Sequence, residues 1–424
     1  MSFTTHKTSN FLRGYVDRLQ AFHPNARLYL LNAVVTGASL GIFRLLFNFF
    51  ILSKGYDSAL LGTFITISSL TSLICALPMG YLADRLGRKL SLILGAMTVV
   101  GSVVIMALAP SIPVLILMNI TLGLGQSLSG VTMGPFLLEN STDKERVYLF
   151  SFSSGLQTGS AFVGNWIGGY LPTWMGSIFH ASATSTLAYG SAIITISVVA
   201  ALGAIPLFLL RKPKNGYTTR GNFTPLNFFK KNWGVVGKLI LPMLVTSIGA
   251  GLIMPFMNVF FRTVHHQSDP VIGSMFAWGS LAMGIGLLIA PALADRFGKI
   301  QVVVITQALS VPFLFLLGFS PVFTLSALAY YVRLALMNMS SPVYQTFVME
   351  RVEEKGRAMV ASLVSMASNF GWAFSPTISG WIQDNYGFKP AFAGTIILYI
   401  ISIFLYWRYF WVKKNKPSPV LPGG

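Results

Sequence analysis

Residues 80–89 read GYLADRLGRK, and residues 291–299 read PALADRFGK. The two stretches lie 211 positions apart, because Asp84 corresponds to Asp295 and 84 + 211 = 295. Other pairs related by this offset are Gly62 and Gly273, Arg85 and Arg296, Gly87 and Gly298, Arg88 and Lys299, Glu139 and Glu350, Arg146 and Arg357, and Gly169 and Gly380. One offset, equal to almost half of the 424-residue chain, predicts two tandem copies of one unit.

The composition indicates that this unit is built for a membrane. The chain is 54% hydrophobic and 10% charged, whereas soluble domains are ~45–50% apolar and ~25% charged. A bilayer-spanning helix needs roughly 20 mostly apolar residues. Such stretches are predicted at 28–53, 59–83, 90–109, 112–138, 149–172, 186–210, 236–261, 271–294, 300–319, 322–349, 358–382 and 390–411. The predicted fold is therefore an all-α membrane protein of twelve transmembrane helices in two pseudo-symmetric six-helix bundles.

The predicted domains follow from these spans. They are an N-terminal interfacial segment (1–27), an N-terminal six-helix bundle (28–210), a cytoplasmic linker (211–235), a C-terminal six-helix bundle (236–411) and a cytoplasmic tail (412–424). Because each copy has an even number of spans, the copies share one orientation. Parallel repeats of this kind are known in transporters that place the substrate site at the midplane between the halves.

The placement of the cations predicts the orientation. The net charge of +18 could suit a nucleic-acid partner, but the cations lie between hydrophobic spans. With Met1 inside, 25 of the 30 Lys and Arg fall on cytoplasmic segments and three (Lys54, Arg262 and Lys389) fall outside. Lys and Arg concentrate in cytoplasmic loops, so both termini are predicted to be cytoplasmic. The membrane predicted is the bacterial inner membrane, with lipids and a small-molecule substrate as partners and no nucleic acid.

The stretch at 80–89 fills every defined position of G-x-x-x-D-R-x-G-R-[RK], and the chain thereby resembles the major facilitator superfamily of solute transporters. The resemblance implies a cytoplasmic gate that closes when the transporter faces outward and breaks when it faces inward. The gate residues implied are Gly80, Asp84, Arg85, Gly87, Arg88, Glu139 and Arg146, with Asp295, Arg296, Gly298, Lys299, Glu350 and Arg357 in the second half. The alternative is a plain loop anchor with positive charges on the inside.

Small residues in the fifth and eleventh spans predict close helix packing. Residues 164–169 read GNWIGG, which resembles the G-P-x-x-G-G pattern of exporters without its proline, and residues 375–380 read SPTISG. Small residues at such spacings let helices approach in lipid. The packing residues predicted are Gly164, Gly168, Gly169, Pro376 and Gly380. The partial match favours export, although Asn119 replaces the fourth-span arginine of many proton-coupled exporters.

Two arginines lie well inside predicted spans, away from their cytoplasmic ends: Arg44 in the first and Arg333 in the tenth. Ionisable residues inside a membrane usually mark function, and arginine suits carboxylate or phosphate. The resemblance implies that helices one, four, seven and ten line the cavity. The candidate substrate-binding residues are therefore Arg44, Asn48, Asn119, Gln126, Asn258, Tyr330 and Arg333. Alternatively, Arg44 extends to the interface, polar neighbours hold either arginine, and the amides bridge helices.

The sequence contains no nucleotide-binding phosphate loop, catalytic motif or metal-ligand cluster, and no acid lies in mid-span. We therefore predict a secondary transporter without cofactor or metal, acting as a monomer and not as an enzyme. The favoured cargo is a small organic or amphipathic solute, anionic ones included, moved outward by rocker-switch alternating access as in multidrug efflux. The alternatives are uptake or exchange of an anion bound by Arg44 and Arg333, a lipid flippase on the same fold, and a non-transporting membrane sensor.

Overall fold

A computed structural model describes residues 22–211, 225–352 and 354–412, which form helices joined by short loops. The first half contains α2 (Pro24–Ser53), α3 (Ser58–Ile74), α4 (Ala76–Leu86), α5 (Arg88–Leu108), α6 (Ile112–Glu139), α7 (Asp143–Ile178), α8 (Thr186–Gly203) and α9 (Ile205–Phe208). The second contains α10 (Pro225–Ile253), η1 (Met254–Phe256), α11 (Met257–Thr263), α12 (Asp269–Phe297), α13 (Lys299–Phe319), α14 (Phe323–Met349), α15 (Glu354–Tyr386), α16 (Phe388–Tyr406) and η2 (Trp407–Trp411).

Each predicted span coincides with one helix or with consecutive helices joined end to end. By length and apolar composition, eight helical segments of the described chain pass as membrane spans, or nine when the bent α3–α4 pair is counted as one. The helices α7, α14 and α15 do not pass. Of these three helices, α7 and α15 pack against the other bundle, and α14 carries Arg333. The all-helical, multi-pass prediction is confirmed, while the count of twelve stays a prediction.

Two of the predicted domain boundaries differ from the helix bounds. Helix α10 begins at Pro225, so residues 225–235, predicted as linker, are helical. Helix α2 begins at Pro24, four residues before the predicted span. Most of the predicted interfacial segment, residues 212–224 of the linker, and all but the first residue of the tail lie outside the described residues.

Local sequence explains where the helices bend and end. Pro78 lacks an N–H and its ring clashes with the carbonyl four residues earlier, and the helix bends there by 57° between α3 and α4. Gly87 has φ 79° and Gly298 has φ 92°, a region that favours glycine. These two residues, related by the repeat offset, make the same tight turn before α5 and α13.

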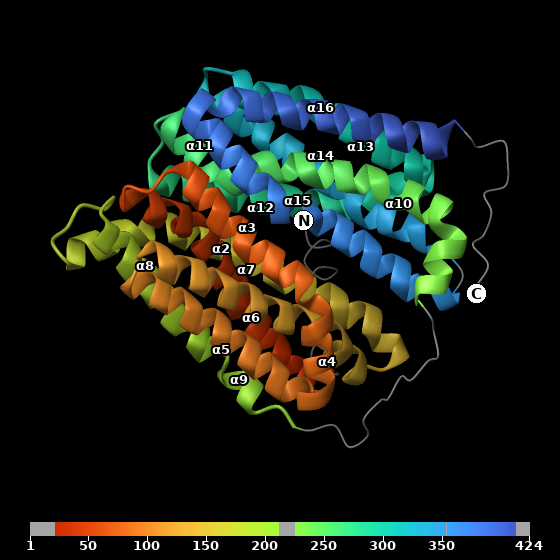
Figure 1. Cartoon of the computed structure of the whole chain (residues 1–424), viewed down its shortest axis with the longest axis horizontal. Coiled ribbons are helices and arrows are strands. Elements are labelled where there is room, and N and C mark those ends of the chain that lie inside the picture. The colour runs from red at the N-terminus through yellow and green to blue at the C-terminus, as the bar shows by residue number, and fades with distance from the viewer. Residues whose placement is uncertain (1–21, 212–224, 353, 413–424) are drawn as a thin grey trace, which may run out of the picture.

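In the described part of the chain, the helices form two bundles that meet toward one end of the molecule. Figure 1 shows α2–α9 and α10–α16 as two groups that lie together at the end carrying α11 and the start of α3. We call this end, with loops 54–57 and 264–268, the joined end. The groups diverge toward α4 and the start of α10, and we call this end, with the turns at Gly87 and Gly298, the split end.

The apolar cores follow the same division. At the joined end, one buried cluster contains Leu46 and Phe49 of the first bundle together with Phe256 and Phe260 of the second. Toward the split end, each bundle has its own cluster, one around Phe136 and the other around Tyr344 and its neighbours. Burial of shared apolar surface therefore holds the bundles together at one end of the molecule.

Candidate transport cavity and gate

A cavity of about 520 Å³ lies between the two bundles. Its walls come from α2, α3, α6 and α7 on one side, and from η1, α11, α12, α14 and α15 on the other. The lining residues include the polar Arg44, Asn48, Asn119, Gln126, Gln157, Asn165, Asn258 and Tyr330, and the apolar Phe43, Phe47, Met254, Phe276, Met283 and Trp372. Six of the seven candidate substrate-binding residues thus lie around one cavity.

Arg44 is the single formally charged residue among the described residues that line the cavity. Its side chain is exposed to the cavity, and none of the described residues hydrogen bonds or ion pairs with it. A guanidinium has five donors in a planar fork that matches carboxylate or phosphate. The cavity therefore presents one open cationic donor group.

The amides of Asn48 and Asn258 bond to each other across the bundles. Asn48 Nδ2 donates to Asn258 Oδ1 at 2.8 Å and to the Pro255 carbonyl at 2.6 Å. Asn258 Nδ2 in turn donates to the Leu45 carbonyl at 2.8 Å. Both residues line the cavity, but these hydrogen bonds use their donors to join α2 with η1 and α11.

The remaining candidates differ in how open their polar atoms are. Asn119 is buried and donates to the Leu115 carbonyl of its own helix at 2.8 Å. Gln126 is exposed to the cavity, so its amide is open to a ligand. The Tyr330 ring stacks on Phe276 with the centroids 5.7 Å apart. Gln126 and the aromatic pair are thus the surfaces a solute would meet beside Arg44.

Arg333 differs from the sequence prediction, because it lies behind the cavity wall and does not line it. Its side chain is 2% exposed, donates to Tyr399 Oη at 2.8 Å and lies 3.3 Å from Met254 Sδ. The prediction rests on a charge inside the span and on the place of the tenth helix at the cavity, whereas the Arg333 side chain points toward α16. Tyr330, about one turn earlier, takes the cavity position on that helix.

Some lining residues were missed by the sequence analysis. Gln157 and Asn165 on α7 and Trp372 on α15 line the cavity, although neither helix was expected to contribute. Asn165 Nδ2 donates to Ser280 Oγ on α12 at 3.4 Å. A glutamine and an asparagine inside an apolar span were the available signal.

At the split end, the predicted gate residues pair within each bundle. Arg88 donates from Nε to Glu139 Oε1 at 2.9 Å and from Nη1 to Asp84 Oδ1 at 2.7 Å. In the second bundle, Lys299 forms an ion pair with Glu350. These are repeat-related pairs, since 88 + 211 = 299 and 139 + 211 = 350.

The other predicted gate residues lie around these pairs. The Arg85 guanidinium stacks 4.5 Å from the centre of the Tyr81 ring, and Arg296 lies 5.2 Å from that of Phe297. Asp295 is exposed, and Gly80 has open space where a Cβ would lie. Arg146 is half-buried near the start of α7, while the Arg357 side chain lies outside the described part of the structure.

The small residues of α7 and α15 lie at close helix contacts. A Cβ on Gly164 would lie 2.2 Å from the Ala38 carbonyl oxygen, and one on Gly168 would lie 3.3 Å from Ile42. These contacts pack α7 on α2 within the first bundle.

The remaining three predicted packing residues lie between the bundles. A Cβ on Gly169 would meet the Asp269 carbonyl oxygen at 2.7 Å, and one on Gly380 would meet the Ser58 carbonyl oxygen at 2.1 Å. The Pro376 carbonyl lies against Gly62. Backbone therefore approaches backbone directly at the joined end.

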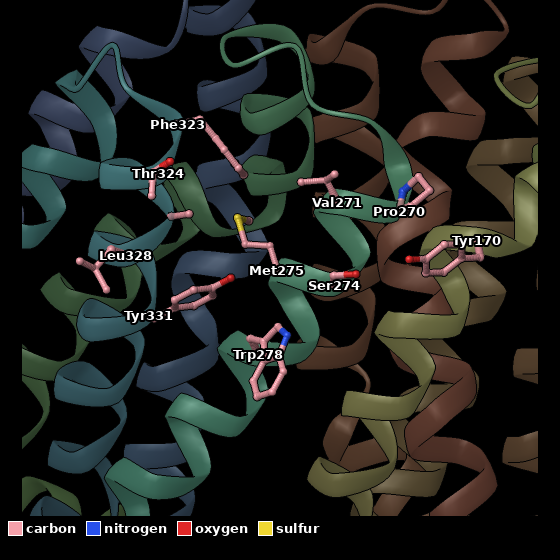
Figure 2. Close-up of a pocket in the computed structure, with 11 residues that line it drawn as sticks. Tyr170, Pro270, Val271, Ser274, Met275, Trp278, Phe323, Thr324, Leu328 and Tyr331 are labelled. Carbon is pink, nitrogen blue, oxygen red and sulfur yellow. The ribbon is translucent and has the colours of Figure 1, made fainter.

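A second pocket lies beside this contact, between α7, α12 and α14. It measures about 490 Å³, and Figure 2 shows Tyr170 on one side and Met275, Trp278 and Tyr331 on the other. Trp278 is 57% exposed, so the pocket opens to the outside of the bundles. No cluster of three or more potential metal ligands is found in the part of the chain that the structure describes.

Two parallel-repeat bundles around a shared cavity are the architecture of one class of multi-pass membrane transporters. The family model described as Major Facilitator Superfamily matches residues 29–249 and 239–424, and the chain belongs to that superfamily. Its members are transporters, which bind small-molecule substrates, and not enzymes.

Known proteins resemble the chain over most of its length. Multidrug resistance protein MdtG of Proteus mirabilis (strain HI4320) is 24% identical over 362 residues, covering 84% of this chain and 87% of that protein. The crystal structure of a bacterial homolog of the human lysosomal transporter Spinster, inward-facing and unoccupied, has a TM-score of 0.73 and 16% identity, covering 93% and 99% of the two chains. The crystal structure of the nucleoside transporter NupG has a TM-score of 0.72 and 14% identity, covering 92% and 100%.

Proposed function

We propose that the protein is a secondary transporter that exports small amphipathic organic solutes by rocking its two bundles around the central cavity. The observation that carries this proposal is a cavity lined by both bundles, together with an apolar core that the bundles share at the joined end. The charge distribution supports assigning the split end to the cytoplasm, with both termini on that side of a bacterial inner membrane. A solute would then enter from the cytoplasm in this conformation.

The export direction is supported by the relatives and by the cavity wall. The Proteus relative is named a multidrug resistance protein and aligns with most of this chain. The wall of the second bundle carries Met254, Phe276, Met283 and Trp372. Methionine and aromatic side chains adapt to differently shaped apolar ligands, so this wall suits a range of amphipathic molecules.

The residue pairs at the split end support a role in closing that side. Arg88 with Glu139 and Lys299 with Glu350 stay within their own bundles in this conformation. Asp84 and Arg85 are exposed beside their contacts with Arg88 and Tyr81, so each has a face that the opposite bundle can reach when the split end closes. A carboxylate such as Asp84 can bind the N–H groups at a helix start.

A second candidate function is transport of an organic anion, and the unpartnered Arg44 favours it. A charge kept without a partner between two bundles is costly, and a bound carboxylate or phosphate would compensate it. Gln126 and Gln157 offer further open amides from the same bundle. Arg333 would support such a site only indirectly, because it does not line the cavity but contacts Met254, which does.

The deciding experiment is transport in proteoliposomes with labelled amphipathic cations, neutral amphiphiles and organic anions. We would compare the intact protein with Arg44→Gln and with Arg44→Lys, which keeps the charge but loses the planar fork. Export of cations and neutral compounds, indifferent to either change, supports multidrug export. Anion transport reduced about tenfold or more in Arg44→Gln and partly kept in Arg44→Lys supports the second candidate. Transport of none of the three classes by a monodisperse protein would overturn both.

A further inference from the structure

Four residues at the joined end, three of them buried and Arg262 half-buried, form a cluster that neither the motif nor the cavity includes. Arg262 lies in the last turn of α11 and Asp269 begins α12, both in the second bundle, and they form an ion pair. Tyr189 on α8 and Phe49 on α2 belong to the first bundle and contact this pair. Asp269 is 6% exposed and Tyr189 is fully buried, so the cluster lies inside the contact between the bundles.

Two of the three hydrogen bonds in the cluster, those that involve the Tyr189 hydroxyl, cross from one bundle to the other. Tyr189 donates from its hydroxyl to Asp269 Oδ2 at 2.7 Å. Arg262 donates from Nη2 to the same hydroxyl and to Asp269 Oδ1. A phenol has one donor and can accept as well, so Tyr189 uses both capacities and connects the two charged groups.

The first bundle also supplies an aromatic face for the cation. The guanidinium carbon of Arg262 lies 3.7 Å from the centre of the Phe49 ring, which is fully buried. A cation over an aromatic face is attracted to it, and more strongly where water is excluded. Together, Phe49 and Tyr189 replace the water that a buried ion pair loses.

The surrounding backbone fixes the position of this cluster. Gly169 on α7 packs on the first turn of α12, where a Cβ would lie 2.7 Å from the Asp269 carbonyl oxygen. Of the acidic residues that the structure describes, Asp269 is the one that is buried. Burial of this kind stabilises only the arrangement in which both bundles meet.

We propose that Phe49, Tyr189, Arg262 and Asp269 form a latch that holds the outer end of the transporter shut while the cavity is loaded from the cytoplasm. The inference rests on the proposed function for its orientation. When the bundles rock, Asp269 and Arg262 stay together in the second bundle but lose the hydroxyl and the ring of the first. The latch therefore shifts the equilibrium between the inward-facing and outward-facing conformations toward the one that is closed at the joined end.

The latch can be tested by measuring from which side a thiol in the cavity is reached. Cys75 is the single cysteine of the chain, so Cys75→Ala gives a background for the reporter Ser69→Cys, which lines the cavity. A membrane-impermeant methanethiosulfonate reagent is added to right-side-out and to inside-out vesicles. The variants are Asp269→Asn, Arg262→Gln and Tyr189→Phe.

The latch predicts labelling from inside and slow labelling from outside in the background protein. Asp269→Asn should raise the labelling rate from outside about tenfold or more and lower the rate from inside to match. The substitution removes the carboxylate charge from the hydrogen bond that Tyr189 donates across the bundles, and it breaks the ion pair that orients Arg262 toward Tyr189 and Phe49. Tyr189→Phe removes only a hydroxyl, so it should act in the same direction by less and keep the fold. If Asp269→Asn is not monodisperse, the labelling rates of Tyr189→Phe alone test the latch.

Asp57→Asn is the matched control at the same end. Asp57 accepts from the Leu60 N–H at 2.8 Å within its own helix, and asparagine caps a helix about as well. The control should leave both labelling rates unchanged. Unchanged rates in folded Asp269→Asn and Tyr189→Phe would overturn the latch. Labelling reports conformation without any substrate, so a failure of the export proposal would appear in the transport assay and not here.

Discussion

Arg88 bonds Glu139 inside the first bundle at 2.9 Å, and the residues 211 positions later, Lys299 and Glu350, pair inside the second. The two pairs differ in burial. The side chains of Arg88 and Glu139 are 18% and 13% exposed, whereas those of Lys299 and Glu350 are 29% and 56% exposed. The same repeated contact therefore has two different environments.

This difference predicts unequal effects of removing each carboxylate charge. Glu139→Gln should destabilise the protein by about 2 kcal/mol, because it weakens charge-assisted hydrogen bonding to a largely buried arginine. Glu350→Gln should cost well under about 1 kcal/mol, as expected for an exposed pair. The measurement is the thermal unfolding midpoint in detergent. Equal shifts of the unfolding midpoint in the two variants would show that the greater burial of the Arg88–Glu139 pair does not make it more stabilising.

The close backbone contacts between the bundles predict which glycines tolerate a methyl group. Gly380→Ala should reduce transport at least about tenfold, because its Cβ would lie 2.1 Å from the Ser58 carbonyl oxygen and the joined end could not close. Gly155→Ala in α7 meets nothing within 4 Å, so it should leave transport and stability nearly unchanged. Transport rates of the purified proteins in vesicles check both. A fully active Gly380→Ala would show that the contact is not needed.

The buried position of Arg333 predicts a stability defect and not a recognition defect. Tyr399→Phe leaves a buried guanidinium donor without its hydroxyl partner and should cost about 1–3 kcal/mol. Arg44→Gln, at an open side chain in the cavity, should leave the unfolding midpoint within about 0.5 kcal/mol of the parent. Thermal unfolding compares the two variants. A stable Tyr399→Phe with altered substrate preference would instead place Arg333 in the substrate site.

His265, in the loop of the joined end, predicts a pH dependence of stability. Burial, and then the positive charge of His266, lower the pKa of His265 from its ordinary value of 6.5. Below that value the unfolded state binds more protons than the folded state, so stability should fall as the pH drops through 6.5 and hold above it.

His265→Gln should flatten this acid-side loss, which unfolding midpoints between about pH 8 and pH 5 would reveal. The matched control is His266→Gln, which removes the neighbouring charge and should reduce the loss only in part. If the unfolding midpoint of the parent protein stays constant as the pH is lowered below 6.5, His265 is not the source of a pH dependence.

The sequence by itself determined the membrane-spanning helices, their duplication and the motif turns, because these depend on local composition and spacing. An apolar stretch long enough to span the bilayer must satisfy its backbone hydrogen bonds within a helix, wherever it lies in the chain. Gly87 and Gly298 make matching turns because the φ they need is set by local sterics. The sequence also contains the information for the pairing of Arg88 with Glu139. The repeat relates Arg88 to Lys299 and Glu139 to Glu350, so a basic and an acidic residue recur at matching positions in both halves.

Only the tertiary structure decided which side chains face the cavity and which residues join the bundles. Depth along a helix is readable from spacing, but the direction of a side chain depends on how that helix is rotated against its neighbours. Arg333 therefore lies behind the wall, while Gln157 lies within it. The contact of Tyr189 with Asp269 depends on two bundles meeting across 80 residues of sequence, a relationship that no local pattern of residues encodes.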